Sequence, residues 1–143
     1  MSLKEPTSKM SKSHVDERSR ILLTDTNDVI RKKIKQALTD SEPTITYDPV
    51  RRPGVSNLIE ILGHIEGIPC EEVVLEYRSV GLRSLKDQVA GSISSHLRGI
   101  RERYLSFIGN GEGYLDAVAE QGAQVARANA ELTVKQVKNA LGL

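Results

Sequence analysis

The chain has 143 residues, the size of one ordinary domain. One cysteine excludes an internal disulfide, and no apolar run approaches the roughly 20 residues of a membrane span. With 20 basic and 19 acidic side chains the net charge is only +1, which argues against a general polyanion binder.

Residues 1–20 differ in composition from the rest of the chain. They are rich in serine and charged side chains and contain few apolar ones. They also lack the apolar region of a secretory signal. Alone, such a segment buries too little surface to offset the entropy lost on ordering. We therefore predict a flexible polar loop over residues 1–20, followed by a helical domain over residues 21–143.

The first helical pattern follows Thr24-Asp25-Thr26, which are N-cap candidates. Apolar residues then recur at helical spacing as far as Leu38, and basic residues crowd the positions between them. This predicts a basic amphipathic helix. Residues 39–54 hold three prolines and read as a long loop.

Four further stretches have helical periodicity. They cover residues 55–65, residues 69–77, residues 82–104 and residues 114–141. The expected ends are Gly67 for the second helix of the chain, Gly109-Asn110-Gly111 for the fourth, and Gly142 for the last, which Gly122 could divide. No alternating strand pattern is present, so we predict an all-α fold: a helical bundle preceded by the polar loop.

The sharpest motif is Lys9-Met10-Ser11-Lys12-Ser13. Two lysines three residues apart in a hydroxyl-rich loop can fold over a polyphosphate, because each ammonium is a point charge suited to phosphate oxygens. Contacts that strengthen as charge develops on leaving pyrophosphate would favour the transition state. On composition alone, a basic disordered tail is the favoured interpretation of this segment.

The same five residues form the second signature of class I aminoacyl-tRNA synthetases. The chain resembles the tryptophanyl-tRNA synthetases of that class, in their bacterial and mitochondrial branch, over essentially its whole length. The resemblance rests on the signature and on Ser19-Arg20-Ile21-Leu22-Leu23-Thr24-Asp25, Lys32-Lys33-Ile34-Lys35-Gln36-Ala37-Leu38-Thr39-Asp40-Ser41 and Pro53-Gly54-Val55-Ser56-Asn57-Leu58. The first class I signature and the Rossmann domain are missing, so the resemblance implies a C-terminal fragment, inactive alone.

The resemblance implies the chemistry of the full enzyme. It joins tryptophan to AMP using ATP and Mg²⁺ and then transfers tryptophan to tRNA(Trp), as a homodimer in the mitochondrial matrix or the cytoplasm. The oligomeric state of the fragment stays open. By resemblance Lys9 and Lys12 are catalytic, and Met10, Ser11 and Ser13 complete the ATP-binding loop, although Met10 is expected mainly to pack the loop.

Two basic groups are candidates for contact with tRNA, and a solvated helix face is the alternative for both. The candidates are Lys32, Lys33 and Lys35, in one cluster with Arg31, and Arg98, Arg101 and Arg103. Asn57 is interpreted as a helix-start residue. The histidines His14, His64 and His96 are too scattered to predict a metal site.

Two functions from other classes stay open. The chain could be a non-catalytic RNA-binding helical module, or an inert fragment that self-associates through bare apolar faces. The charge distribution favours a phosphate-facing front half. Residues 1–52 carry 11 basic and 8 acidic groups, whereas residues 53–143 carry 9 and 11.

Overall fold

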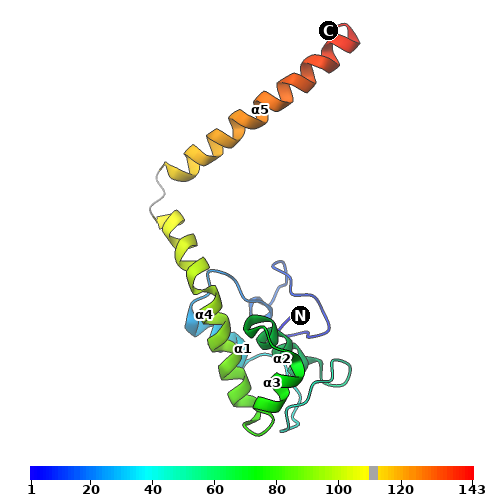
Figure 1. The fold of residues 1–143 in the computed structure, drawn as a ribbon, viewed down its shortest axis with the longest axis vertical. Helices are drawn as coiled ribbons and strands as arrows, with labels where there is room; N and C mark the ends of the chain where they lie inside the picture. The colour runs from blue at the N-terminus through cyan, green and yellow to red at the C-terminus, as the bar shows by residue number, and fades with distance from the viewer. Residues whose placement is uncertain (110–112) are drawn as a thin grey trace. The chain divides into compact units, whose positions relative to one another are not determined.

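The computed structural model describes residues 1–109 and 113–143, and within these ranges it contains helices and no strands (Figure 1). The all-α prediction is therefore confirmed for the described residues. The elements are the short 3-10 helix η1 (Glu17–Ser19), α1 (Asn27–Lys35), α2 (Pro53–Glu66), α3 (Cys70–Tyr77), α4 (Gly81–Gly109) and α5 (Tyr114–Leu141). They form two compact units, residues 1–101 and residues 102–143.

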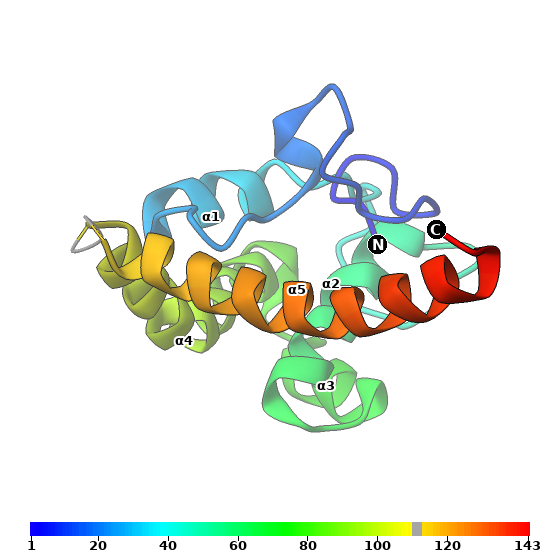
Figure 2. The ribbon, with the colours of Figure 1, turned by 90° about the horizontal axis from the view of Figure 1, so that it is seen from above.

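The hydrophobic core lies in the first unit. Helices α1 to α4 each contribute buried apolar side chains to it, and three loop residues, Leu3, Ala37 and Ile45, complete it. Figure 2 shows the backbone of these helices. The most buried members of the core are Leu3, Ile30, Ile34, Ile45, Val55, Leu58, Ile59, Leu62, Val73, Leu85 and Val89. Aliphatic side chains fill this core.

Leu3 corrects the interpretation of residues 1–20. These residues have little regular structure, as predicted. However, the Leu3 side chain is only 1% exposed and packs within the core. The amide of Leu3 donates to the Ser19 carbonyl at 2.9 Å, and the carbonyl of Leu3 accepts from the Leu38 amide at 2.7 Å. Residues 1–20 are therefore fixed to the core through Leu3 and do not form a free tail.

Helix α1 begins where the capping residues predict, because the Thr26 hydroxyl accepts from the Val29 amide at 3.4 Å. It ends at Lys35, earlier than the apolar pattern through Leu38 indicates. The Leu38 amide donates to the Leu3 carbonyl instead of continuing the helix, and the Leu38 side chain is exposed. Lys86 on α4 donates to the Ala37 carbonyl at 2.9 Å and so satisfies an oxygen beyond the end of α1.

Helix α2 packs closely against the chain that follows α1. A Cβ at Gly54 would lie 2.2 Å from the Leu38 carbonyl oxygen, so this position accepts only glycine. The helix ends at Gly67, which has a left-handed φ of 71° and confirms the predicted stop.

The loop before α2 is organised around one arginine. The Arg52 guanidinium donates to both carboxylate oxygens of Asp40, at 2.7 and 3.0 Å. It also donates to the Thr44 carbonyl at 2.6 Å and to the Thr46 hydroxyl at 2.7 Å. These bonds lower the pKa of Asp40, chiefly through the side-chain hydrogen bond from Arg52. The hydrogen bonds of Arg52 therefore hold the proline-rich loop before α2 in one conformation.

The second unit consists of the end of α4 and helix α5. Gly109 is the last residue of α4, and Asn110 and Gly111, which were also expected to end it, lie outside the described residues. Helix α5 runs through Gly122 without the possible break and is capped by Gly142, with φ 73°. No residue of α5 is buried. None of the described helices has the length and apolar character of a membrane span.

Candidate functional site

The lysine motif lies in a loop whose two ends are joined. The Leu3–Ser19 hydrogen bond closes residues 4–18, and the Ser2 amide adds a bond to the Ser8 carbonyl at 2.8 Å. A segment of this length with adjoining ends is an Ω-loop. The composition of residues 1–20 predicts a polar loop but gives no sign of this closure, because it depends on backbone groups.

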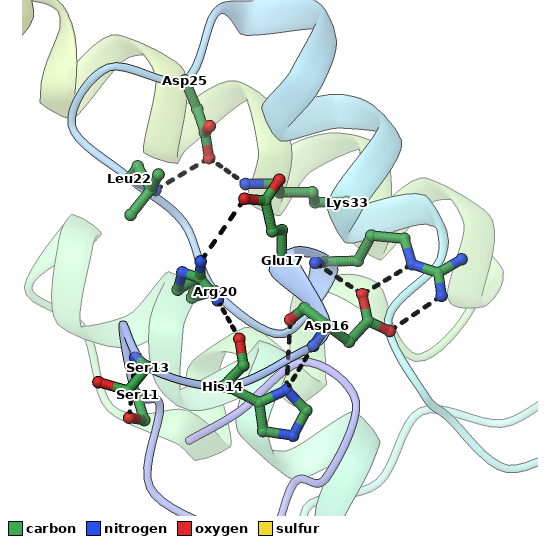
Figure 3. A network of polar contacts seen from close by, with 10 residues as sticks. Ser11, Ser13, His14, Asp16, Glu17, Arg20, Leu22, Asp25 and Lys33 are labelled. Carbon is green, nitrogen blue, oxygen red and sulfur yellow. Dashed lines mark hydrogen bonds and ion pairs between the residues drawn. The ribbon is translucent and has the colours of Figure 1, made fainter.

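The part of the loop that follows the lysine motif, residues 14–20, is held by its own polar side chains (Figure 3). Arg20 donates to the His14 carbonyl at 2.8 Å and lies 3.9 Å from the Glu17 carboxylate. Arg18 donates to both oxygens of Asp16 at 2.9 Å, and this side-chain hydrogen bond is the largest cause that lowers the pKa of Asp16 to about 2. The loop thus has its own charge network beside the lysine motif.

The motif itself faces outward. Lys9, Ser11, Lys12 and Ser13 are exposed. Within the described residues, neither lysine ammonium has a hydrogen-bond or ion-pair partner. Met10 is half-buried and packs against the core beside a hollow of about 260 Å³, which fits its expected packing role. Two free cations and two hydroxyls are therefore presented to solvent from an anchored loop.

The basic residues of α1 do not share one environment. Lys32 and Lys35 are exposed, as an RNA-facing role requires. Lys33 is 8% exposed, and its ammonium lies 2.6 Å from the Asp25 carboxylate. Asp25 also accepts from the Leu22 amide at 2.9 Å. The structure therefore gives Lys33 a buried structural contact that the sequence analysis missed.

The arginines of α4 also divide into different settings. Arg98 is exposed. Arg101 donates to the Asp25 carbonyl and to the Asn27 side chain, each at 2.8 Å, and so ties α4 to the start of α1. Arg103 is exposed and belongs to the second unit. Of the three, Arg98 is the one whose free guanidinium lies beside α1.

Two hollows lie between α1 and α4 within the first unit. One, of about 470 Å³, is lined by Arg31, Lys35, Leu82, Arg83, Lys86 and Asp87. The other, of about 220 Å³, is lined by Asn27, Arg31, Gly91, Ser94, Ser95 and Arg98. Arg31 is common to both, and together they form what we call the basic groove. The lining residues from α4 include the small Gly91, Ser94 and Ser95 and one carboxylate, that of Asp87.

The basic groove joins residues far apart in the sequence. Arg83 was not recognised as a site candidate, because no local motif contains it. Packing of α4 on α1 places it beside Arg31 and Lys35. A tertiary arrangement of this kind has no signature in a single sequence.

The model of one known family, described as tRNA synthetases class I (W and Y), matches residues 1–98. The chain belongs to this family. Two curated relatives are tryptophan–tRNA ligases. The chain is 38% identical over 142 residues to that of Rickettsia conorii and 40% identical over 143 residues to that of Oceanobacillus iheyensis. These matches cover 99% and 100% of the chain but 43% of each relative.

A solved structure agrees with the family assignment. The tryptophanyl-tRNA synthetase from Mycoplasma pneumoniae superimposes with a TM-score of 0.68 at 27% identity, over 100% of this chain and 43% of that one. The chain thus spans less than half the length of its family relatives. The relatives named here are bacterial, and they give no support to the mitochondrial expectation.

Proposed function

We propose that this chain is part of a tryptophan–tRNA ligase, in which it supplies the lysine loop to ATP and the basic helical surface to tRNA(Trp). The observation that carries the proposal is the similarity to tryptophan–tRNA ligases along its whole length, with the lysine motif exposed on a closed loop. The activity belongs to a protein that contains the remaining part of the relatives. We expect the chain alone to be inactive, because activation needs both substrates bound and oriented.

The residues of the loop fit a triphosphate. Lys9 and Lys12 offer unpaired ammoniums, and Ser11 and Ser13 offer hydroxyls next to them. ATP supplies the adenylate and the pyrophosphate leaving group. Lys12, with support from Lys9, would neutralise the negative charge that develops on the departing phosphates and so lower the barrier more than it tightens ground-state binding. Mg²⁺ would share that charge in the whole enzyme.

The basic groove is the best RNA-facing surface of the first unit. Arg31, Lys35, Arg83 and Arg98 are exposed around it, and Lys32 lies on the same helix as Arg31. Arginine and lysine contacts to phosphate position RNA without reading its sequence. Lys33 and Arg101 would support this surface from within, because their charged groups are already occupied. Arg103 stays a candidate on the second unit.

The wider assignments follow the relatives. We infer tryptophan as the amino-acid substrate, a homodimer for the whole enzyme and, from the bacterial relatives, the bacterial cytoplasm as its location. A non-catalytic RNA-binding module is the alternative that the basic groove favours. Self-association through the exposed apolar residues of α5 is the third.

ATP–pyrophosphate exchange tests the loop. We expect background exchange from this chain and restored exchange in a hybrid protein in which it replaces the matching region of the Oceanobacillus iheyensis ligase. Lys12→Ala in the hybrid should lower the activation rate about 100-fold or more with little change in tryptophan affinity. Lys135→Ala, an exposed lysine of α5, is the control. An equal loss of activation rate and tryptophan affinity in Lys12→Ala would contradict the transition-state role of Lys12.

Binding of tRNA(Trp) at several salt concentrations tests the groove in this chain. Each phosphate contact contributes about 0.7 to 0.9 to the slope of log K against log salt. Lys35→Ala and Arg98→Ala should each weaken binding and lower the slope, whereas Lys135→Ala should not. Binding by the chain without exchange activity in the hybrid would favour the RNA-binding module. A concentration-dependent size of the free chain would favour self-association.

A further inference from the structure

The Asn57 carboxamide joins α2 to the start of the chain. Asn57 is 4% exposed and lies past the first turn of α2, so it is not the helix-start residue that the sequence analysis suggested. Its Oδ1 accepts from the Met1 nitrogen at 2.9 Å. Its Nδ2 donates to the carbonyl oxygens of Met1 and Ser2 at 3.3 and 3.4 Å. Both ends of one buried amide are therefore used by the same short backbone segment.

That segment is the stem of the lysine loop. Ser2 donates its amide to the Ser8 carbonyl, next to Lys9. The Ser2 hydroxyl accepts from the amides of Lys4 and Glu5 at 3.3 and 3.2 Å. Through its backbone contact with Asn57, Ser2 links α2 to both the first turn of the loop and the residue before the motif.

We propose that Asn57 is the positioning residue of the lysine loop, whose buried carboxamide holds the stem from which Lys9 and Lys12 are presented. The inference rests on the proposed function of that loop. Asn57 does not touch ATP in this role. It fixes where the loop starts, so that the two ammoniums meet the phosphates in one place.

Hydrogen exchange of the chain tests the anchor without requiring activity. Asn57→Leu removes all three bonds at similar volume, and exchange at the amides of residues 2–20 should rise about tenfold. The amides of α3 and the first half of α4 should change little. As a matched control, Leu58→Ala removes a neighbouring core side chain and should raise exchange throughout the first unit. Unchanged loop exchange in Asn57→Leu, or a rise as uniform as that of Leu58→Ala, would overturn the inference.

A second substitution provides a graded comparison that a general packing role would not show. In Asn57→Asp the new carboxylate can still accept from the Met1 nitrogen, which is a charged ammonium, but it cannot donate to the Met1 and Ser2 carbonyl oxygens. At one fixed pH, loop protection in Asn57→Asp should therefore lie between that of the wild-type protein and that of Asn57→Leu. Protection in Asn57→Asp as low as in Asn57→Leu would contradict the hydrogen-bonding role.

The hybrid protein separates this inference from the function on which it rests. We expect Asn57→Leu to lower the activation rate about tenfold while the KM for tryptophan stays unchanged. If Lys12→Ala lowers the rate and Asn57→Leu does not, the positioning role fails alone. If Lys12→Ala has no effect in an active hybrid, the proposed function of the loop fails, whatever the exchange data show for Asn57.

Discussion

The two units of the chain have similarly spaced apolar residues, but these are buried in the first unit and exposed in the second. In residues 1–101 the apolar side chains of four helices pack against one another and against three loop residues, and Leu58 is 0% exposed. In residues 102–143 the leucines and valines of α5 recur along the helix, yet Leu132 is 67% exposed and no residue of α5 is buried. Periodicity therefore predicts the helix but not what the helix packs against.

The largest expected effect compares one leucine from each unit. Leu58→Ala should destabilise the chain by about 3 kcal/mol, because it removes a fully buried side chain and leaves a cavity. Leu132→Ala should change stability by less than about 0.5 kcal/mol, since its side chain is exposed. Urea unfolding followed by circular dichroism measures both. A comparable loss of stability in Leu132→Ala would show that α5 is packed in solution and would contradict the contrast between the two units.

The next effect compares neighbouring lysines of the first unit. Lys33→Ala leaves the Asp25 carboxylate buried without its ion pair and should cost about 3 kcal/mol. Lys32→Ala removes an exposed charge and should cost less than about 0.5 kcal/mol. Binding of tRNA(Trp) at a temperature where both variants are folded should show the reverse order. If Lys33→Ala weakened RNA binding more than Lys32→Ala does, the Lys33 ammonium would have to contact RNA, and the buried structural role would be wrong.

A smaller effect concerns ion pairs. The pairing with Arg52 lowers the pKa of Asp40, so its contribution to stability is complete above the ordinary Asp value of 3.8. It is lost as the pH falls from there through the lower folded-state pKa. Asp40→Asn should cost about 1 kcal/mol at neutral pH and less at low pH, since the carboxylate is partly exposed.

The matched ion pair lies in the second unit. Glu120 and Arg127 of α5 lie 3.6 Å apart with both side chains exposed. Glu120→Gln should change stability by less than about 0.5 kcal/mol at any pH. Thermal unfolding as a function of pH compares the two variants. A cost for Asp40→Asn that does not shrink on acidification would contradict the linkage.

The smallest effect concerns a glycine in each unit. A Cβ at Gly122 would meet nothing within 4 Å, so Gly122→Ala should stabilise α5 by about 0.5 to 1 kcal/mol and raise its helix content. Gly54→Ala is the opposite case, because its Cβ would collide with the Leu38 carbonyl and lower stability. Circular dichroism during thermal unfolding measures both changes. Reduced helix content in Gly122→Ala would indicate that the helix bends there.

Local signals predicted the local features of this fold. Thr26, Gly67 and Gly142 mark helix ends by their own capping chemistry, and the periodicity located the helices between them. The lysine motif was likewise visible as a string of residues. Such features need only neighbouring residues, and for that reason the sequence revealed them.

The features that the sequence did not reveal depend on partners outside the immediate neighbours, from eight positions away to the far end of the first unit. Leu3 is buried although its segment is polar, because its backbone is hydrogen-bonded to Ser19 and Leu38. Lys33 looks like its exposed neighbours until α1 is placed beside Asp25. Arg83 reaches the basic groove only through the packing of α4. Composition and spacing carry no information about such pairings.

The closed stem of the lysine loop also bears on the order of folding. Helices α1 to α4 form from contacts along the chain, whereas Asn57 reaches Met1 across 56 positions and Leu38 reaches Leu3 across the length of α1 and the lysine loop. Long-range closures of this kind form late, since their loop entropy is lost before the contacts compensate for it. We therefore expect the segment that carries Lys9 and Lys12 to be the last part of the first unit to become native and the first to open.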